Sequence, residues 1–261
     1  MAITYHAGRR IQGLSSDTKP TNVQSGSRFE ETDTRKIYNY LENLLIFEDD
    51  YTTNSGWTQT GTKVTVDSGT PDKVKGTGNS GIGTQESVTK SLGVTLSNTT
   101  WSAEFELKMI SASDWYSIPF GLSAGTSNIE TATQDSVGIT FNGNGGLQPK
   151  VYGFYKDGSG SWTQVIPTSI LYLTAGTLYY LRVERTSSTN IKISVFTDSG
   201  RTTHITNSPY NFTIPSTIGG LTTIQHSHRA DSFANNSTWE IDNVKIYDAF
   251  SSTGFRWAEE V

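Results

Sequence analysis

The sequence predicts an all-β protein built as a sandwich or barrel, on three observations. The segment from Trp101 to Met109 alternates strictly between apolar and polar residues, which is the period of a strand with one buried face. Further short apolar segments follow, separated by turns rich in Gly, Asn, Asp and Ser. Ser, Thr, Gly and Asn are abundant and 11% of residues are aromatic, a composition that favours strands over helices.

The bulk properties of the 261-residue chain exclude several classes of protein. It has no cysteine, so disulfides and thiolate zinc sites are excluded. The net charge of -5 comes from interspersed charges without a Lys/Arg-rich run, so we expect no nucleic-acid partner. No apolar stretch approaches the roughly 18 residues that cross a bilayer, and the basic start lacks the apolar segment of a secretory signal. We expect a protein made in the cytoplasm, without membrane insertion.

Strands are predicted at short intervals along most of the chain. The clearest one places Trp101, Phe105 and Met109 on its buried face and Glu104 and Glu106 on the other. The stretch Tyr38–Phe47 resembles a helix but is short, and fits a strand plus linker equally well. The other predicted strands are Tyr116–Leu122, Ser136–Phe141, Lys150–Tyr155, Trp162–Ile166, Thr177–Arg185, Asn190–Phe196, Gly220–His226 and Thr238–Tyr247.

Three regions are expected from the pattern along the chain. Residues 1–26 are polar with few apolar anchors and predict an extended N-terminal arm. Residues 27–44 predict a β-hairpin, Arg28–Glu31 and Arg35–Tyr38 around a turn, completed by a short strand within 250–261. Residues 45–249 contain the sandwich. Because an isolated hairpin is only marginally stable in water, we expect it to draw stability from a partner surface.

Two segments of the sandwich resemble the concanavalin A-like lectin and glucanase superfamily. The opening Phe47-Glu-Asp-Asp-Tyr-Thr-Thr-Asn-Ser-Gly-Trp57 and the closing Trp239-Glu-Ile-Asp-Asn-Val-Lys-Ile-Tyr247 are similar to its first and last strands. The resemblance covers roughly Leu45–Asp248. It implies a jelly roll of two antiparallel sheets in which the first and last strands are neighbours.

The flanking hairpin carries a second resemblance. Gly26-Ser-Arg-Phe-Glu-Glu-Thr-Asp-Thr-Arg-Lys-Ile-Tyr38 is similar to a short module of structural proteins of tailed viruses, which a Trp-x-Glu strand follows. Here that strand is found only at Trp257-Ala-Glu259, so the jelly roll is expected to be inserted into the module. The resemblance implies an attachment role, with assembly residues predicted at Phe29, Ile37, Tyr38, Phe255 and Trp257.

The superfamily includes retaining glucanases, so the resemblance makes glycoside hydrolysis one alternative function. Those enzymes need two nearby carboxylates, which the resemblance would place on one strand as Glu-x-Asp-x-x-Glu. Glu240 and Asp242 begin such a pattern, but Lys245 occupies its last position. Glu104 and Glu106 are followed by no third acid. We expect no catalytic residues and no enzyme activity, with a glycoside hydrolase as the least favoured alternative.

Candidate metal ligands follow from the same resemblance, which implies a structural calcium ion at Asp242 with help from Asp49 or Asp50. The alternative is that Asp242 caps a turn or pairs with a lysine. His226 and His228 share one strand face and are interpreted as a surface pair, with transition-metal binding as the alternative.

Aromatic side chains beside loops are candidate platforms for sugar rings. They are Trp115, Tyr116, Tyr155 and Trp162, the last two flanking a glycine-rich turn. The alternative is that they belong to the core or cover loop edges.

Taken together, these features predict a non-enzymatic viral structural or accessory protein, located in the virion and needing no signal peptide. We expect it to bind other virion subunits through the arm and hairpin, to form homo-oligomers and to display a lectin-like jelly roll that binds host-surface glycans. The alternative is a cellular carbohydrate-binding module or lectin.

Overall fold

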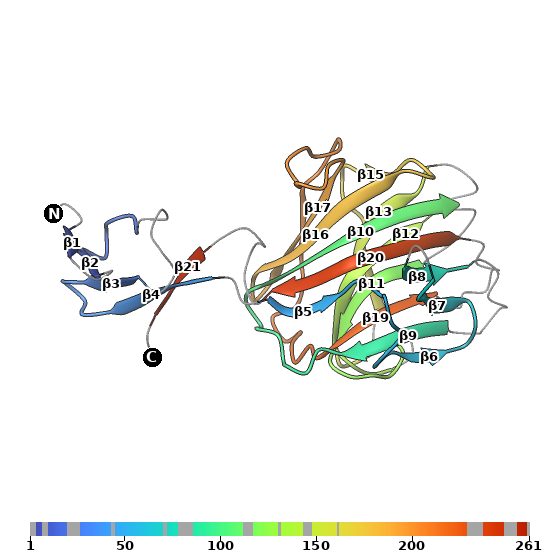
Figure 1. Cartoon of the computed structure of the whole chain (residues 1–261), viewed down its shortest axis with the longest axis horizontal. Helices are drawn as coiled ribbons and strands as arrows, with labels where there is room; N and C mark the ends of the chain where they lie inside the picture. The colour runs from blue at the N-terminus through green and yellow to red at the C-terminus, as the bar shows by residue number, and fades with distance from the viewer. Residues whose placement is uncertain are drawn as a thin grey trace. The chain divides into compact units, whose positions relative to one another are not determined.

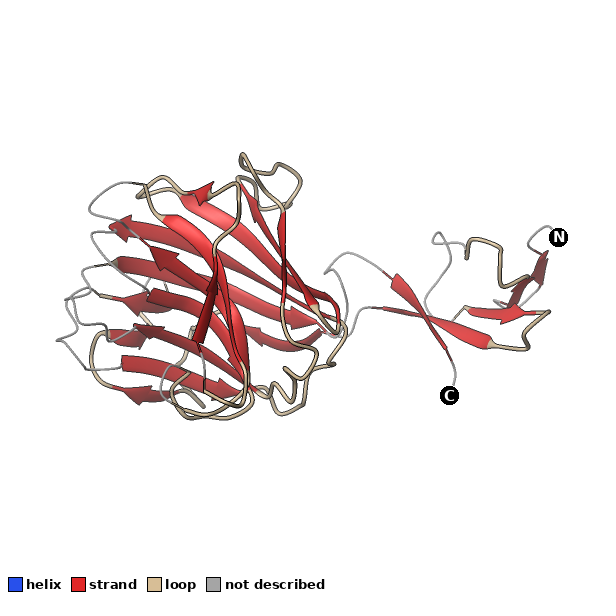
Figure 2. Cartoon of the chain, turned by 180° about the vertical axis from the view of Figure 1, so that it is seen from behind, coloured by secondary structure: helices blue, strands red, loops and turns tan. Residues whose placement is uncertain are grey.

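The computed structural model divides into two compact units, one of residues 1–45 and 251–261 and the other of residues 46–250 (Figure 1). It describes residues 4–6, 10–19, 27–42, 45–69, 72–77, 86–111, 117–129, 132–142, 148–160, 162–228, 237–247 and 255–259. Every regular element among these residues is a strand (Figure 2). The described residues therefore include no helix long enough to cross a membrane.

The first unit is a five-stranded sheet. Its strands in order are β1 (Thr4–His6), β2 (Arg10–Gly13), β3 (Arg28–Glu31), β4 (Ile37–Glu42) and β21 (Phe255–Glu259). β3 and β4 pair antiparallel as the predicted hairpin, and β21 pairs with β4 from the far end of the sequence. The predicted N-terminal arm contributes β1 and β2, and β2 runs parallel to β3. Residues 46–250 are thus inserted between two strands of one sheet.

The second unit consists of two eight-stranded sheets. The β10 sheet has the order β18-β17-β16-β10-β20-β8-β7, with β5 also pairing with β20. Its strands are β5 (Leu45–Asp49), β7 (Val64–Asp67), β8 (Lys73–Gly76), β10 (Trp101–Ser111), β16 (Leu178–Ser187), β17 (Asn190–Phe196), β18 (Tyr210–Thr213) and β20 (Thr238–Tyr247).

The β11 sheet has the order β14-β13-β12-β11-β19-β9-β6, with β15 also pairing with β13. Its strands are β6 (Thr58–Thr60), β9 (Glu86–Ser91), β11 (Ser117–Ser123), β12 (Ser136–Asn142), β13 (Lys150–Lys156), β14 (Trp162–Val165), β15 (Leu171–Tyr172) and β19 (Thr223–His228). Every pairing whose register is given within the two large sheets is antiparallel, as predicted for a jelly roll.

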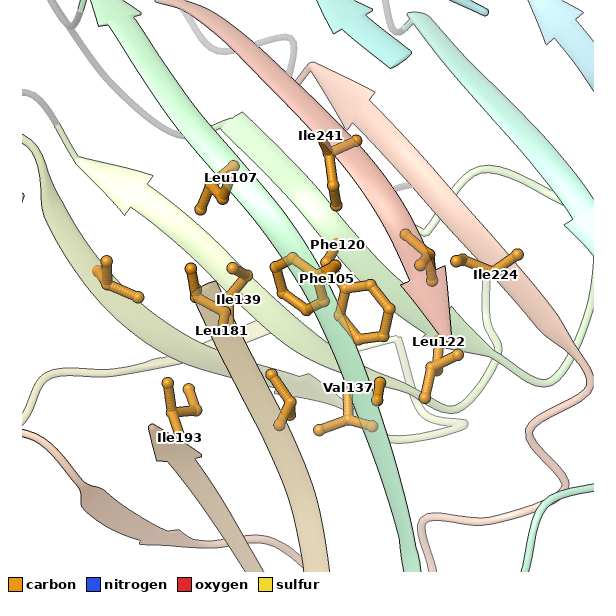
Figure 3. Packing of buried hydrophobic residues seen from close by; sticks show 14 of the residues in the cluster. Phe105, Leu107, Phe120, Leu122, Val137, Ile139, Leu181, Ile193, Ile224 and Ile241 are labelled. Carbon is orange, nitrogen blue, oxygen red and sulfur yellow. The ribbon is translucent and has the colours of Figure 1, made fainter. Parts of the chain in front are cut away.

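The core lies between the two sheets and follows from the alternation of the strands. The predicted inward face of β10 is fully buried, and the ring of Phe105 stacks on Phe120 of the opposite sheet with centroids 4.7 Å apart (Figure 3). β5 pairs with β20, so the opening and closing strands are neighbours as the resemblance implied. The helix-like stretch Tyr38–Phe47 is in fact part of β4 and β5, the alternative that its short length allowed.

One side of the sandwich is closed by a buried polar cluster. The carboxylate of Asp49 accepts hydrogen bonds from Lys90 Nζ at 2.6 Å and from Trp57 Nε1 at 3.0 Å. Tyr51 is fully buried, and its hydroxyl lies 2.9 Å from His226 Nε2. The other ring nitrogen of His226 contacts the carbonyl oxygen of Pro119. Because that carbonyl can only accept, Nδ1 carries the proton and Nε2 accepts from Tyr51.

The predicted surface pair of histidines is therefore wrong. His226 and His228 are both fully buried on the inward side of β19, where His228 Nδ1 lies 3.0 Å from Ser117 Oγ. Burial lowers the pKa of each to about 4, since an uncompensated positive charge is costly in the interior. The prediction failed because the inward face of β19 carries polar residues at one end. Polar residues at alternate positions of a strand normally indicate its exposed face.

We predict that the jelly roll loses stability as the pH falls from about 6.5 toward 4. Both histidines have a folded pKa below the unfolded value of 6.5, so their stabilisation is present above pH 6.5 and disappears on acidification. Each histidine accounts for a loss of roughly 3 kcal/mol of unfolding free energy once the pH is below about 4. Asp242, whose pKa burial raises to about 6, opposes part of this loss. Urea unfolding at several pH values measures the effect.

His228→Gln is the matched variant for this experiment. It removes one of the two groups, so about half of the histidine contribution to the pH dependence is expected to disappear. An unfolding free energy that stays constant between pH 7 and pH 4.5 would contradict the prediction.

Candidate functional site

The outward face of the β10 sheet is lined by ion pairs. Glu104 is buried and bonds Arg182 through Nε and Nη2 at 2.8 and 2.7 Å, while Arg201 approaches it to 3.5 Å. Further pairs join Glu184 to Lys192 at 2.5 Å and Glu240 to Lys73 at 2.7 Å. The carboxylates considered for glycoside hydrolysis lie on this face, and Glu104 and Glu240 are held by cations.

Asp242 and Glu106 are cross-strand neighbours on the same face. A β-bulge at this point brings Asn243 to a φ of 50°, and its N–H donates to Asp242 Oδ1 at 2.7 Å. Burial raises the pKa of Asp242 to about 6 against the effect of that bond, and the charges of Glu106, Asp50 and Asp72 add to the rise.

The predicted calcium ligands Asp49, Asp50 and Asp242 have different partners in the structure. Asp49 points inward and its charge is neutralised by Lys90, so it does not fit a calcium ligand. Asp50 is exposed and accepts from the N–H and the hydroxyl of Thr52, which lower its pKa. Among the described residues there is no group of three or more His, Asp or Glu side chains placed to hold a metal ion.

Two of the aromatic residues predicted to form a sugar-binding platform, Tyr155 and Trp162, lie on opposite faces of the β11 sheet. Tyr155 packs against the main core, whereas Trp162 lies opposite Lys156 in register and on the other face of the β11 sheet. The ring of Trp162 stacks on Phe154 at 4.3 Å and covers a small apolar cluster. Trp115 and Tyr116 lie outside the described residues.

The predicted assembly residues belong to the five-stranded sheet. Phe29 is fully buried, and Lys19 Nζ lies 5.2 Å from its ring and 4.1 Å from that of Tyr38. Lys19 also bonds Glu31 at 2.8 Å, the leading cause of the lowered pKa of that carboxyl. Ile37 is half-buried in β4. Phe255 and Trp257 lie in β21, and their side chains are outside the description.

The outward face of the β11 sheet differs from that of the β10 sheet because five of its strands, β6, β9, β19, β11 and β12, present neutral residues there. Thr58, Thr89, Gln225, Gly121 and Gly138 lie in one cross-strand row over five neighbouring strands. A second row runs from Thr60 through Ser87 to Ser227. All of these face outward, since their strand neighbours such as Val88, Ile224 and Val137 are core residues.

A loop after β11, described at residues 124–129 and 132–135, crosses this face. Gln225 holds it at two points, accepting from the N–H of Ile129 at 2.7 Å and donating to the carbonyl of Ser127 at 3.0 Å. Glycine allows the close approach, because a Cβ on Gly121 would lie 2.5 Å from Ile129 Cδ1. Ile129 then packs with Ile118 and Phe154.

Between this loop and the edge of the sheet lies a groove of about 410 Å³. That volume is within the range of about 300–1,000 Å³ found for ligand sites. The strands β6 and β9 form one part of the lining and the loop forms the other. The lining residues are all neutral and polar: Thr58, Thr60, Ser87, Thr89, Thr126, Ser127 and Asn128.

The hydroxyl groups of the groove are available to a ligand. Ser87 and Thr89 are only 3% and 5% exposed, yet they line the groove. Within the described part of the chain, the hydroxyls of Thr58, Thr60, Ser87 and Thr89 make no hydrogen bond. None of these oxygens is among the buried atoms that lack a partner, so each can be reached from the groove and can bond a ligand or water there.

Sequence reasoning missed this groove. The segment Ser87-Val-Thr89 carries the polar-apolar alternation of a half-buried strand, a signal that was present but short, whereas Thr58-Gln-Thr60 is polar throughout. No local sequence pattern shows that the two segments pair as neighbouring strands, or that a loop distant in sequence forms the other side of the groove.

No family model matches the chain, and no curated protein sequence matches it. Solved structures are similar in fold. Xylan beta-1,4-xylosidase from Bacillus halodurans C-125 is 12% identical with a TM-score of 0.52, matching 77% of this chain, which spans only 38% of that enzyme. The carbohydrate recognition domain of Emp47p is 13% identical with a TM-score of 0.51, over 80% of this chain and 97% of that domain.

A third similar structure is the CBM2 module of evolved Dit from Lactobacillus casei BL23 phage J-1, at 9% identity and a TM-score of 0.49. It covers 80% of this chain and 98% of that module. The likeness of fold rests on the two structures whose TM-scores exceed 0.5. With the two antiparallel sheets described above, it establishes that residues 46–250 form a jelly-roll sandwich of the lectin-like kind.

Proposed function

We propose that this chain is a non-enzymatic, particle-associated viral protein whose jelly roll binds a glycan in the groove beside β6 and β9. The observation that carries the binding function is the set of unpartnered hydroxyls lining a cavity of about 410 Å³. Sugars are recognised by neutral hydrogen-bonding groups that pair with their hydroxyls, and the groove offers seven neutral polar residues.

At the groove, a binding function accords better than catalysis with the placement of the acidic residues. General acid–base chemistry needs a carboxyl group that is free to exchange a proton. Glu104 and Glu240 are each held by a lysine or arginine, and Asp242 lies with Glu106 on the sheet face opposite to the groove. The groove itself has no carboxylate among its described lining residues.

The attachment function is proposed for the five-stranded sheet. Its hairpin carries the sequence similar to a module of tailed-virus structural proteins, and the jelly roll is inserted between β4 and β21. Of the apolar side chains described in this unit, Ile11 and Phe29 are the buried ones. A sheet with so small a core is only marginally stable without disulfides or a bound metal. We therefore propose that other copies of the chain or other particle subunits cover this sheet.

Blocking the groove tests the glycan-binding proposal. Ser127→Trp places a large ring on an exposed loop position of the lining, and we expect it to weaken glycan binding at least tenfold because the cavity is filled. Binding is measured first on a glycan array and then by calorimetry with the glycans found. The fold is checked by circular dichroism.

Ser199→Trp is the matched control, because Ser199 is exposed in the turn that follows β17 of the β10 sheet and does not line the groove. It should bind as the wild type does. Equal binding by both variants would remove the groove from consideration, and no binding by the wild type to any glycan would overturn the function.

Phe29→Ala tests the attachment proposal. Loss of the ring from the small core is expected to destabilise the five-stranded sheet by about 3–5 kcal/mol, and so to abolish higher-order assembly. Mass photometry measures assembly, and glycan binding should persist because the groove lies in the other unit. Arg35→Ala is the control, because Arg35 is 81% exposed and its nearest anion, Glu30, is 3.9 Å away.

This experiment also separates the viral protein from the alternative, a cellular lectin or carbohydrate-binding module. A lectin that acts by itself would remain monomeric and bind glycan equally well with or without Phe29. Assembly that survives Phe29→Ala would contradict the attachment role of the sheet.

A further inference from the structure

The chemistry of the groove indicates which class of glycan it accepts. Many cell-surface sugars carry a carboxylate, sulfate or phosphate, and sites for these groups normally supply Arg, Lys or a helix N-terminus. Among the described residues, no charged side chain lines the groove. An anionic sugar placed here would lose hydration without gaining a counter-charge.

Two lysines of the β11 sheet are already used elsewhere. Lys90 follows Thr89 in β9, but it points to the interior and pairs with Asp49 at 2.6 Å. Lys156 lies on the outward face with only 1% exposed, and its Nζ contacts the carbonyl oxygen of Ile129 at 3.3 Å. Freeing either one would leave a buried group without its partner, which is costly.

The groove is suited to neutral hydroxyls for a second reason. A serine or threonine hydroxyl donates one hydrogen bond and accepts others, so it pairs with a sugar hydroxyl in either direction. The four strand positions form a lattice: Thr58 faces Thr89, and Thr60 faces Ser87. On the neighbouring strand β19 the second row continues to Ser227, whose Oγ is buried and has no hydrogen-bond partner within the described part of the chain.

We propose that the groove selects an uncharged oligosaccharide and discriminates against glycans that bear carboxylate, sulfate or phosphate groups. The proposal rests on the glycan-binding function above and deepens it. The selectivity comes from two features: strand hydroxyls that make no hydrogen bond within the described part of the chain, and the absence of a cation among the described lining residues.

The test uses the full-length chain on an array of glycan pairs that share a backbone and differ only in a carboxylate or sulfate group. The neutral member of each bound pair is expected to bind at least tenfold more tightly. The double variant Thr58→Val and Thr89→Val replaces two hydroxyls by methyl groups of similar size. Loss of two hydrogen bonds should weaken neutral binding about tenfold. Thr65→Val makes the same change on β7 of the other sheet and should have no effect.

A second variant tests whether the preference can be shifted toward acidic glycans. Thr60→Lys adds a cation to the lining and should move the preference toward the acidic member by threefold or more, an effect that high salt suppresses. Equal or tighter binding of acidic glycans by the wild type, lost in the double valine variant, would overturn the selectivity but keep the groove. Binding that the double valine variant leaves unchanged would instead overturn the proposed site.

Discussion

The structure depends on the packing of two sheets across a shared interior, because this fixes the direction of every side chain along each strand. Val88 shows the constraint: its side chain is fully buried in the core, so Ser87 and Thr89 on either side of it must face outward. A shift of one residue in β9 would bury two hydroxyls and expose the valine. The groove is therefore held in place by the core beneath it, without any contact among its own hydroxyls.

The same constraint gives the two outward faces different electrostatic characters. On the β10 sheet, charged residues alternate with core residues and are neutralised in cross-strand pairs, Glu104 with Arg182 and Glu184 with Lys192. Apart from Asp242 and Glu106, the acidic residues named on this face are thus held by cations. On the β11 sheet the corresponding positions carry hydroxyls, amides and glycines, which leave both space and hydrogen-bonding capacity.

The fold was largely predictable from the sequence, whereas the candidate site was not. Long alternating segments such as Trp101–Met109 predict their strands well, because the core imposes the same period of two on all of them. The histidines of β19 misled this reasoning, since His226 is satisfied inside the core by Tyr51 and Pro119, partners that are 175 and 107 residues away. Likewise, Tyr155 and Trp162 are close in sequence but register places them on opposite faces. The alternation of apolar and polar residues distinguishes the buried face of a strand from its exposed face only where the buried face is apolar.

The way Gln225 holds the loop has a consequence for how recognition can diversify. Both of its bonds go to main-chain atoms, the N–H of Ile129 and the carbonyl of Ser127, so the anchoring requires nothing of the side chains at Thr126 or Ser127. These two positions can change identity while the backbone stays fastened to the same glutamine. Related chains with a different residue at either position would thus keep the scaffold and alter only the wall of the cavity, so new specificities can arise by single substitutions that leave folding undisturbed.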